Sequence, residues 1–427
     1  MEDIGNKIYN LAVELFPIYR SITGDGARET LRIIKRHLPL LKIFKVPSGT
    51  RCFDWIVPPE WNIKDAYILD PKGKKIADFK KNFLHILAYS VPIHKKVSLK
   101  ELNKHLYSLP KQSNAIPYTS SFYEKRWGFC IAHNQKEKLK QGFYSVHIDT
   151  TLAPGYLNYG ELLIPGKSRK EVMFSTPLCH PYCANNGLSG LAVTTYLAKW
   201  IMSIRHRYYT YRIVLVPQTI GSIYYVSQHL KYLKRHVKMG FNVTCVGDDK
   251  TYSYMPSRSG NTLADRIARH VLKHIYPEFI AYSFLERGGD ERQYCSPGVG
   301  LPIVSVMRSK YGTYPEYRTS KDNLSFISPR GLYGGYSAIK YCILCAEKNE
   351  ILKSTVLCEP HLGKKGLYPT LSIKEKKQKI NTIKDVIAYS DGTRDLLDIA
   401  DILEIKMWDL LEIVEELKRT HIVNSHR

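Results

Sequence analysis

Apolar residues recur along this chain with two different spacings, and the change from one to the other predicts its architecture. In residues 4–37 they return every three or four positions, as at Ile4, Ile8 and Leu11, which predicts two amphipathic helices. From residue 46 to residue 138, short apolar runs alternate with Pro, Gly and aromatic residues. This texture is typical of a small β-rich module, which we interpret as an insertion into a larger domain.

Between residues 142 and 346 the pattern alternates between short apolar runs and longer amphipathic stretches. Strands are expected at residues 171–175, 212–217, 242–246 and 302–307, and helices at 188–203, 222–232, 263–275 and 331–347. Such alternation predicts an α/β domain with a mainly parallel sheet and flanking helices. Ligands of such sheets bind at the carboxyl ends of the strands. The polar segments that follow the strands should therefore converge on one cleft.

A separate unit is expected after a Pro-containing linker at Tyr368 and Pro369. Residues 373–422 predict three short helices, the second at 395–403 and the third at 407–419. Helices of this length and order resemble a winged-helix or helix-turn-helix module.

Charge and composition change this picture in two respects. The 427 residues carry a net charge of +24, which would suit a nucleic acid or an anionic surface, and 44% of them are hydrophobic, as in a folded globular protein. The third C-terminal helix, however, places four acidic residues where a DNA-reading helix needs cations, namely Asp409, Glu412, Glu415 and Glu416. We therefore expect this module to pack or to bind a protein partner or a second copy, and nucleic acid is disfavoured.

The compartment is also indicated by the sequence. No run of 18 apolar residues and no secretory signal pattern is found, so a cytoplasmic location without a membrane anchor is expected. The nine Cys residues give no disulfide framework, and Cys342 and Cys345 fall in a helical run where core packing is the simplest role.

Several loop motifs together resemble a known family. They are Cys179-His180-Pro181, Leu188-Ser189-Gly190, residues 219–222 (Thr-Ile-Gly-Ser), residues 246–249 (Val-Gly-Asp-Asp), residues 287–298 and residues 314–317 (Tyr-Pro-Glu-Tyr). The chain resembles bacterial aminopeptidase-like proteins of the di-zinc aminopeptidase clan, which carry a β-rich insertion and a C-terminal winged helix. The resemblance implies a discontinuous α/β domain at 1–45 and 139–366, an inserted domain at 46–138 and a winged helix at 373–427. It also suggests a link to surface-polysaccharide or secondary-metabolite pathways.

The resemblance implies a site with two zinc ions, which this sequence departs from at three positions. In the clan, His and carboxylate side chains hold the metals, one Asp bridges them, and a Glu acts as general base. Here Asn186 stands at the bridging Asp position, Gln218 at the Glu position and Arg318 at a late His position. An amide cannot serve as a base, and a guanidinium cannot bind zinc.

Few metal ligands remain, namely His180 and one of Asp248 and Asp249, as vestigial candidates. Two protein ligands fall short of the three that catalytic zinc uses, so no cofactor is expected, and zinc would be present only if the ligand set were rearranged. We expect Arg318 to take the place of a cation and to pair with Asp248 or Asp249. The expected ligand pocket comprises His180, Asn186, Gln218, Asp248, Asp249, Asp290 and Arg318.

Plainer roles stay open for the same residues. His180 could be a hydrogen-bonded structural histidine, and Asp248-Asp249 could be a solvated turn. An ion-pair network of Asp290 with Arg287, Glu291 and Arg292 could simply shape its loop.

The sequence thus predicts an aminopeptidase-like protein with a decayed di-metal site, inactive as a metallopeptidase, that binds a small polar or peptide-like ligand. The alternatives are an active zinc-dependent aminopeptidase or amidohydrolase with a rearranged ligand set, and a DNA-binding regulator.

Overall fold

The computed structural model describes residues 2–367 and 374–427, so the expected linker at Tyr368 and Pro369 and the boundary residue 373 lie outside the described residues. The chain divides into two compact units. The first holds Met1–Asp265 and Phe279–Ser337, and the second holds Arg266–Glu278 and Ala338–Arg427. Every helix of the described residues is too short or too polar to cross a lipid bilayer.

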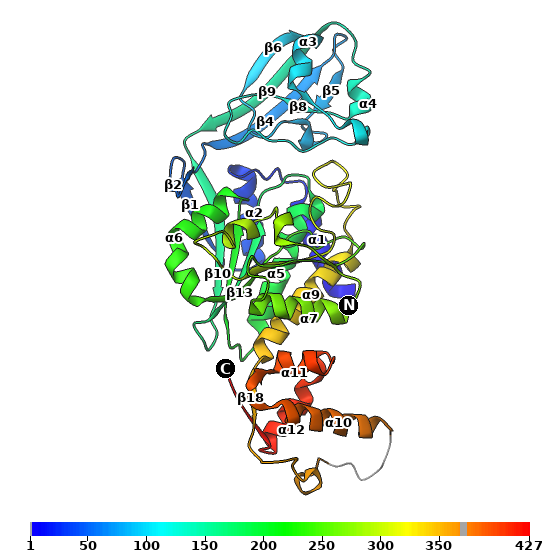
Figure 1. Cartoon of the computed structure of the whole chain (residues 1–427). Helices are drawn as coiled ribbons and strands as arrows, with labels where there is room; N and C mark the ends of the chain where they lie inside the picture. The colour runs from blue at the N-terminus through cyan, green and yellow to red at the C-terminus, as the bar shows by residue number, and fades with distance from the viewer. Residues whose placement is uncertain (1, 368–373) are drawn as a thin grey trace. The chain divides into compact units, whose positions relative to one another are not determined.

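An eight-stranded sheet forms the centre of the first unit (Figure 1). In spatial order its strands are β1 (Lys42–Pro47), β10 (Tyr156–Ile164), β12 (Thr210–Val216), β11 (Glu171–Pro177), β13 (Val237–Asn242), β16 (Ile303–Met307), β14 (Ser253–Met255) and β15 (Ile280–Ala281). The four neighbours β12, β11, β13 and β16 are mutually parallel, while β1, β10 and β14 pair antiparallel. The predicted α/β fold with a mainly parallel sheet is confirmed.

Helices cover both faces of this sheet, which explains why every residue of β11 is buried. On one face, α5 (Ser189–Ser203) packs against α1 (Glu2–Leu15) and α2 (Asp25–His37). The connection from β11 to β12 contains α5, and the connection from β12 to β13 contains α6 (Ile220–His236) and runs the opposite way along the sheet. Right-handed crossovers therefore place α5 and α6 on opposite faces.

Between β1 and β10 the chain forms the inserted β-rich module. Its four-stranded antiparallel sheet has the order β5 (Lys75–Asp78), β4 (Glu60–Leu69), β9 (Phe143–Ala153) and β6 (Ile93–Ser98). The module buries its own hydrophobic cluster, which includes Ile68, Phe129 and Tyr144. Strand β9 belongs to this sheet although it begins at Phe143, after the expected boundary at residue 138, and it leads directly into β10. The boundaries at 46 and 138 stay a prediction.

The second unit contains the elements of a winged helix. A three-stranded antiparallel sheet is formed by β18 (Asp391–Asp395), β17 (Ile351–Ser354) and β19 (Val423–His426), and it accompanies α10 (Lys374–Tyr389), α11 (Leu396–Ile402) and α12 (Leu411–Arg419). The carboxylate of Asp395 caps α11 by accepting the Asp398 N–H at 2.9 Å. Strand β17 precedes residue 373, which the sequence predicted as the start of the module.

Candidate functional site

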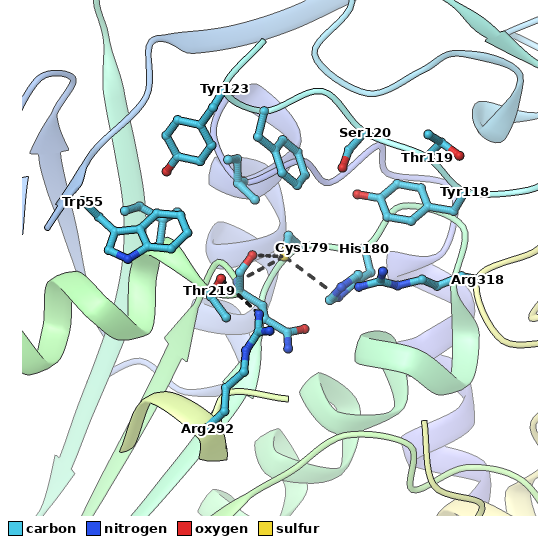
Figure 2. A pocket seen from close by; sticks show the side chains of 14 residues that line it. Trp55, Tyr118, Thr119, Ser120, Tyr123, Cys179, His180, Thr219, Arg292 and Arg318 are labelled. Carbon is cyan, nitrogen blue, oxygen red and sulfur yellow. Dashed lines mark hydrogen bonds between the residues drawn. The ribbon is translucent and has the colours of Figure 1, made fainter. Parts of the chain in front are cut away.

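Two parallel strands bring His180 and Gln218 to one place. His180 follows the carboxyl end of β11 and Gln218 follows the end of β12, and neighbouring parallel strands end at the same edge of a sheet. Both residues line a pocket of about 470 Å³ in the first unit, and Arg318 lines it too (Figure 2). A cavity of this volume falls in the range of small-molecule sites.

Cys179 and His180 form the buried floor beside this pocket. The Gln218 N–H donates to the Cys179 Sγ at 3.2 Å, and the His180 Nδ1 lies 3.9 Å from the same sulfur. Burial raises the pKa of the Cys179 thiol to about 12. Burial, together with the positive charges of Arg318 and Arg20, lowers the pKa of His180 to about 3. His180 is therefore a neutral imidazole and Cys179 a neutral thiol at physiological pH.

Arg292 and Arg318 supply the charged groups of the pocket. Both side chains are exposed, and within the described ranges neither guanidinium has a carboxylate within 4.0 Å. The Arg292 Nη2 donates a long hydrogen bond of 3.5 Å to the Thr219 hydroxyl, and the Arg318 guanidinium lies 5.5 Å from the centroid of the Tyr317 ring. The pocket is thus lined by two cations and by no Asp or Glu.

The expected ion pair of Arg318 with an aspartate is wrong. Asp248 is buried and is held by neutral donors, since its carboxylate accepts the Asn185 Nδ2 at 2.9 Å and the Ser309 N–H at 2.9 Å. Asp249 is exposed and accepts the Ser328 hydroxyl. Hydrogen bonds from amide and hydroxyl groups satisfy both carboxylates, so neither needs a replacement cation.

Asn186 lies behind the pocket rather than in its wall. It is 4% exposed, its Nδ2 has no hydrogen-bond partner, and its backbone N–H donates to the Asp322 Oδ2 at 3.1 Å. The Asn185 N–H donates to the Asp322 Oδ1 at 2.7 Å. Burial raises the pKa of Asp322 to about 7. Asp322 was not among the predicted site residues, although its position shortly after the motif at residues 314–317 was a usable signal.

Asp290 and Glu291 shape the neighbouring loop without the expected ion pairs. Within the described residues, no salt bridge joins either carboxylate to Arg287 or Arg292. Glu291 instead accepts the N–H groups of residues 288 and 289 at 2.9 and 2.8 Å. Asp290 accepts the Ser222 hydroxyl at 2.9 Å, and it does not line the pocket. Hydrogen bonds to neutral donors take the role that charge pairing was expected to play.

These residues do not fit a zinc site. The described residues contain no group of three or more His, Cys, Asp or Glu side chains placed to hold a metal ion. The pocket lining places His180 with the Gln218 amide and the Arg318 guanidinium, and neither of these two groups can serve as an anionic metal ligand. The donor set therefore lacks the ligands that a zinc site requires.

The large sheet, the flanking helices and the pocket at the strand ends define an aminopeptidase-like α/β protein. The solved zinc aminopeptidase of Bacillus subtilis matches 80% of this chain and 94% of its own with a TM-score of 0.59, at 15% sequence identity, which is a likeness of fold alone. A crystal structure of a provisionally named peptidase of Clostridium acetobutylicum matches 100% of this chain and 97% of its own, with a TM-score of 0.93 and 40% identity.

The chain belongs to the DUF4910 family, whose model, described as a domain of unknown function, matches residues 9–349. A model described as a winged helix-turn-helix matches residues 350–425. A relative from Clostridium acetobutylicum is 43% identical over 400 residues, which are 93% of this chain and 91% of the relative. That relative is provisionally named a polysaccharide biosynthesis protein with an aminopeptidase-like domain. The resemblance inferred from the motifs, including the winged helix, is confirmed.

Proposed function

We propose that this protein uses the aminopeptidase fold to bind a small polar or peptide-like ligand and has no di-zinc peptidase activity. The observation that carries the proposal is the lining of the pocket, which combines His180 with Gln218 and Arg318 and contains no carboxylate. A peptidase of the di-zinc type needs anionic ligands for its metals and a base for the attacking water. The lining supplies no anionic ligand, and its one imidazole, His180, is a weak base because its pKa is lowered to about 3.

The charge of the pocket supports the same proposal. Two Zn²⁺ ions would add four positive charges beside Arg292 and Arg318, and the lining offers no negative charge to offset them. The Gln218 amide can donate and accept hydrogen bonds, which suits the orientation of a ligand. We further propose a role in polysaccharide biosynthesis, on the strength of the relative's provisional name alone.

The winged helix enters the proposal as a packing or protein-binding module. Helix α12 carries exposed or half-buried Glu412, Glu415 and Glu416, and only its last turn is basic. Carboxylates on this helix would repel a phosphate backbone. DNA binding is therefore not proposed, and the module is the candidate site for a protein partner or a second copy.

The test compares the wild type with a triple variant, Asn186→Asp, Gln218→Glu and Arg318→His. Zinc content is measured by elemental analysis after purification without chelator, and turnover is measured with an aminoacyl amide. Wild type should carry much less than one zinc per chain and show no turnover above background. The triple variant should bind zinc, because it regains carboxylate and imidazole ligands.

The three single reversions are the matched controls, and each should stay low in zinc because the site remains short of ligands or cationic. Two stoichiometric zinc ions in the wild type, or hydrolysis at an ordinary enzymatic rate, would refute the proposal. Either result would favour an active hydrolase with a rearranged ligand set.

A further inference from the structure

The two arginines that line the pocket form no ion pair with any carboxylate of the described residues. Arg292 and Arg318 line it without a carboxylate within 4.0 Å among the described residues. Free guanidinium groups on the wall of a concave site attract anions, and they bind carboxylate and phosphate oxygens with paired N–H donors. The lining therefore selects against a ligand with a free amine at this position.

A third cation, Arg20, acts electrostatically on the pocket residue His180. Arg20 is fully buried, its Nη1 donates to the carbonyl oxygens of Leu15 and Ile18, and its Nε and Nη2 have no hydrogen-bond partner. The positive charge of Arg20 acts on a residue of the pocket lining, because Arg20, like Arg318, lowers the pKa of His180. A buried charge is screened by salt much less than an exposed one. The buried charge of Arg20 therefore adds to the positive charge that Arg318 exerts on His180.

The opposite wall is aromatic. Trp55 and Tyr123 from the inserted module meet edge to face with ring centroids 5.7 Å apart, and they remain 40% and 54% exposed. Figure 2 shows these two rings on one side of the pocket, with Arg318 and Tyr118 on the other and Arg292 below. Hydroxyl groups of Ser120 and Thr219 also belong to the lining. The lining as a whole therefore combines ring faces with hydrogen-bonding groups.

We propose that the pocket binds a small saccharide that carries a negatively charged group, a refinement that rests on the function proposed above. The C–H face of the sugar ring packs on Trp55 and Tyr123. Its hydroxyls bond to Ser120, Thr219 and the Gln218 amide, and its carboxylate or phosphate lies between Arg292 and Arg318. A carboxylate and a phosphate ester share this chemistry, and the probes below distinguish them.

The experiment is calorimetric titration of the full-length protein with glucuronate, glucose 1-phosphate, glucose and benzoylglycine. At least one of the two anionic sugars should bind, with glucose at least ten-fold weaker, and the tighter of the two identifies the anionic group. Raising the NaCl concentration should weaken the anionic sugar. Equal affinity for glucose would overturn the anionic assignment. Tighter binding of benzoylglycine than of either sugar would overturn the saccharide assignment.

Variants assign the binding to the named side chains. Arg292→Ala and Arg318→Ala should each weaken the anionic sugar ten-fold or more, and Arg→Lys at either position should restore part of the affinity. Trp55→Ala should weaken both sugars. The matched controls Arg287→Ala and Lys321→Ala remove exposed cations from the same two loops, outside the lining. Loss of binding in the controls as large as in the pocket variants would overturn the proposal.

The inference and the proposed function fail separately. Zinc content and amide turnover decide the peptidase question whatever the sugars do. If turnover is absent and no probe binds, the saccharide inference is overturned while the loss of peptidase activity stands. Zinc-dependent turnover with selective binding of the anionic sugar would leave the inference intact and refute the proposed function.

Discussion

Asp290 is a buried carboxyl group that should give the protein a measurable loss of stability as the pH rises. It is 0% exposed, its Oδ1 accepts the Ser222 hydroxyl at 2.9 Å, and its Oδ2 has no hydrogen-bond partner. Burial, opposed by the Ser222 bond and by Arg292 and reinforced by the charge of Glu291, raises its pKa from 3.8 to about 7. In the unfolded chain the same carboxyl is hydrated and ionises near its ordinary pKa.

This difference in pKa between the folded and unfolded states decides whether stability rises or falls with pH. A carboxyl whose pKa is higher in the folded state binds its proton more tightly there, so its contribution is fully present below pH 3.8 and is lost as the pH rises through about 7. Between pH 5 and pH 8 this single group should cost about 3 kcal/mol of unfolding free energy. Asp290→Asn has no charge to gain, so the variant should lack this part of the pH dependence.

The assay is urea unfolding at pH 5 and pH 8, with the difference between wild type and Asp290→Asn taken at each pH. The variant should gain about 3 kcal/mol relative to wild type between the two conditions. Asp54→Asn is the matched control, because that side chain is exposed and the same chemical change is made in water. A difference that is the same at both pH values would refute the argument, since it would mean that Asp290 is equally ionised in the folded and unfolded states.

Two further predictions concern the scaffold that positions the pocket. Arg212→Met should lower the unfolding free energy by about 3–5 kcal/mol, because it would leave the carboxylate of Glu171 as an unpaired buried charge. The Glu171 side chain is 1% exposed and lies 2.6 Å from the Arg212 guanidinium. A loss below about 1 kcal/mol in urea unfolding would contradict this prediction. Gly190→Ala should lower the melting temperature, because an added Cβ would lie 2.2 Å from the Val243 carbonyl oxygen. An unchanged melting temperature in calorimetry would contradict that close approach.

The large sheet could be predicted from the sequence because its strands are buried on both faces. The strand expected at 171–175 is β11 (Glu171–Pro177), and the helix expected at 188–203 is α5 (Ser189–Ser203). Strands of this kind appear in the sequence as short continuous apolar runs, whereas in the amphipathic helices between them apolar residues recur every three or four positions. The three pocket residues at His180, Gln218 and Arg318 followed from motifs at strand ends and in the loop after β16.

The opposite wall of the pocket could not be predicted in the same way. Trp55 and Arg292 line one cavity although 237 positions separate them in the sequence. The local spacing of apolar residues carries no information about residues that distant. Trp55 looked like one aromatic residue among many in the inserted module. Arg20 sits in a short segment after the first helix, where its sequence context suggests exposure rather than burial. The places of Trp55 and Arg20 in the structure depend on how segments distant in the sequence pack together.

Two buried carboxyl groups, Asp290 and Asp322, bear on the charge around the pocket. Asn186 and Gln218 carry uncharged amides, and the raised pKa values of Asp290 and Asp322, each about 7, mean that these two carboxyl groups hold a proton over part of the physiological range. The carboxylate of Asp248 accepts hydrogen bonds from neutral donors and needs no cation. Arg318 is consequently not the substitute for a metal that its position in the sequence suggested. Its guanidinium lines the pocket without a carboxylate within 4.0 Å among the described residues, so it is available to bind an anionic group of a ligand.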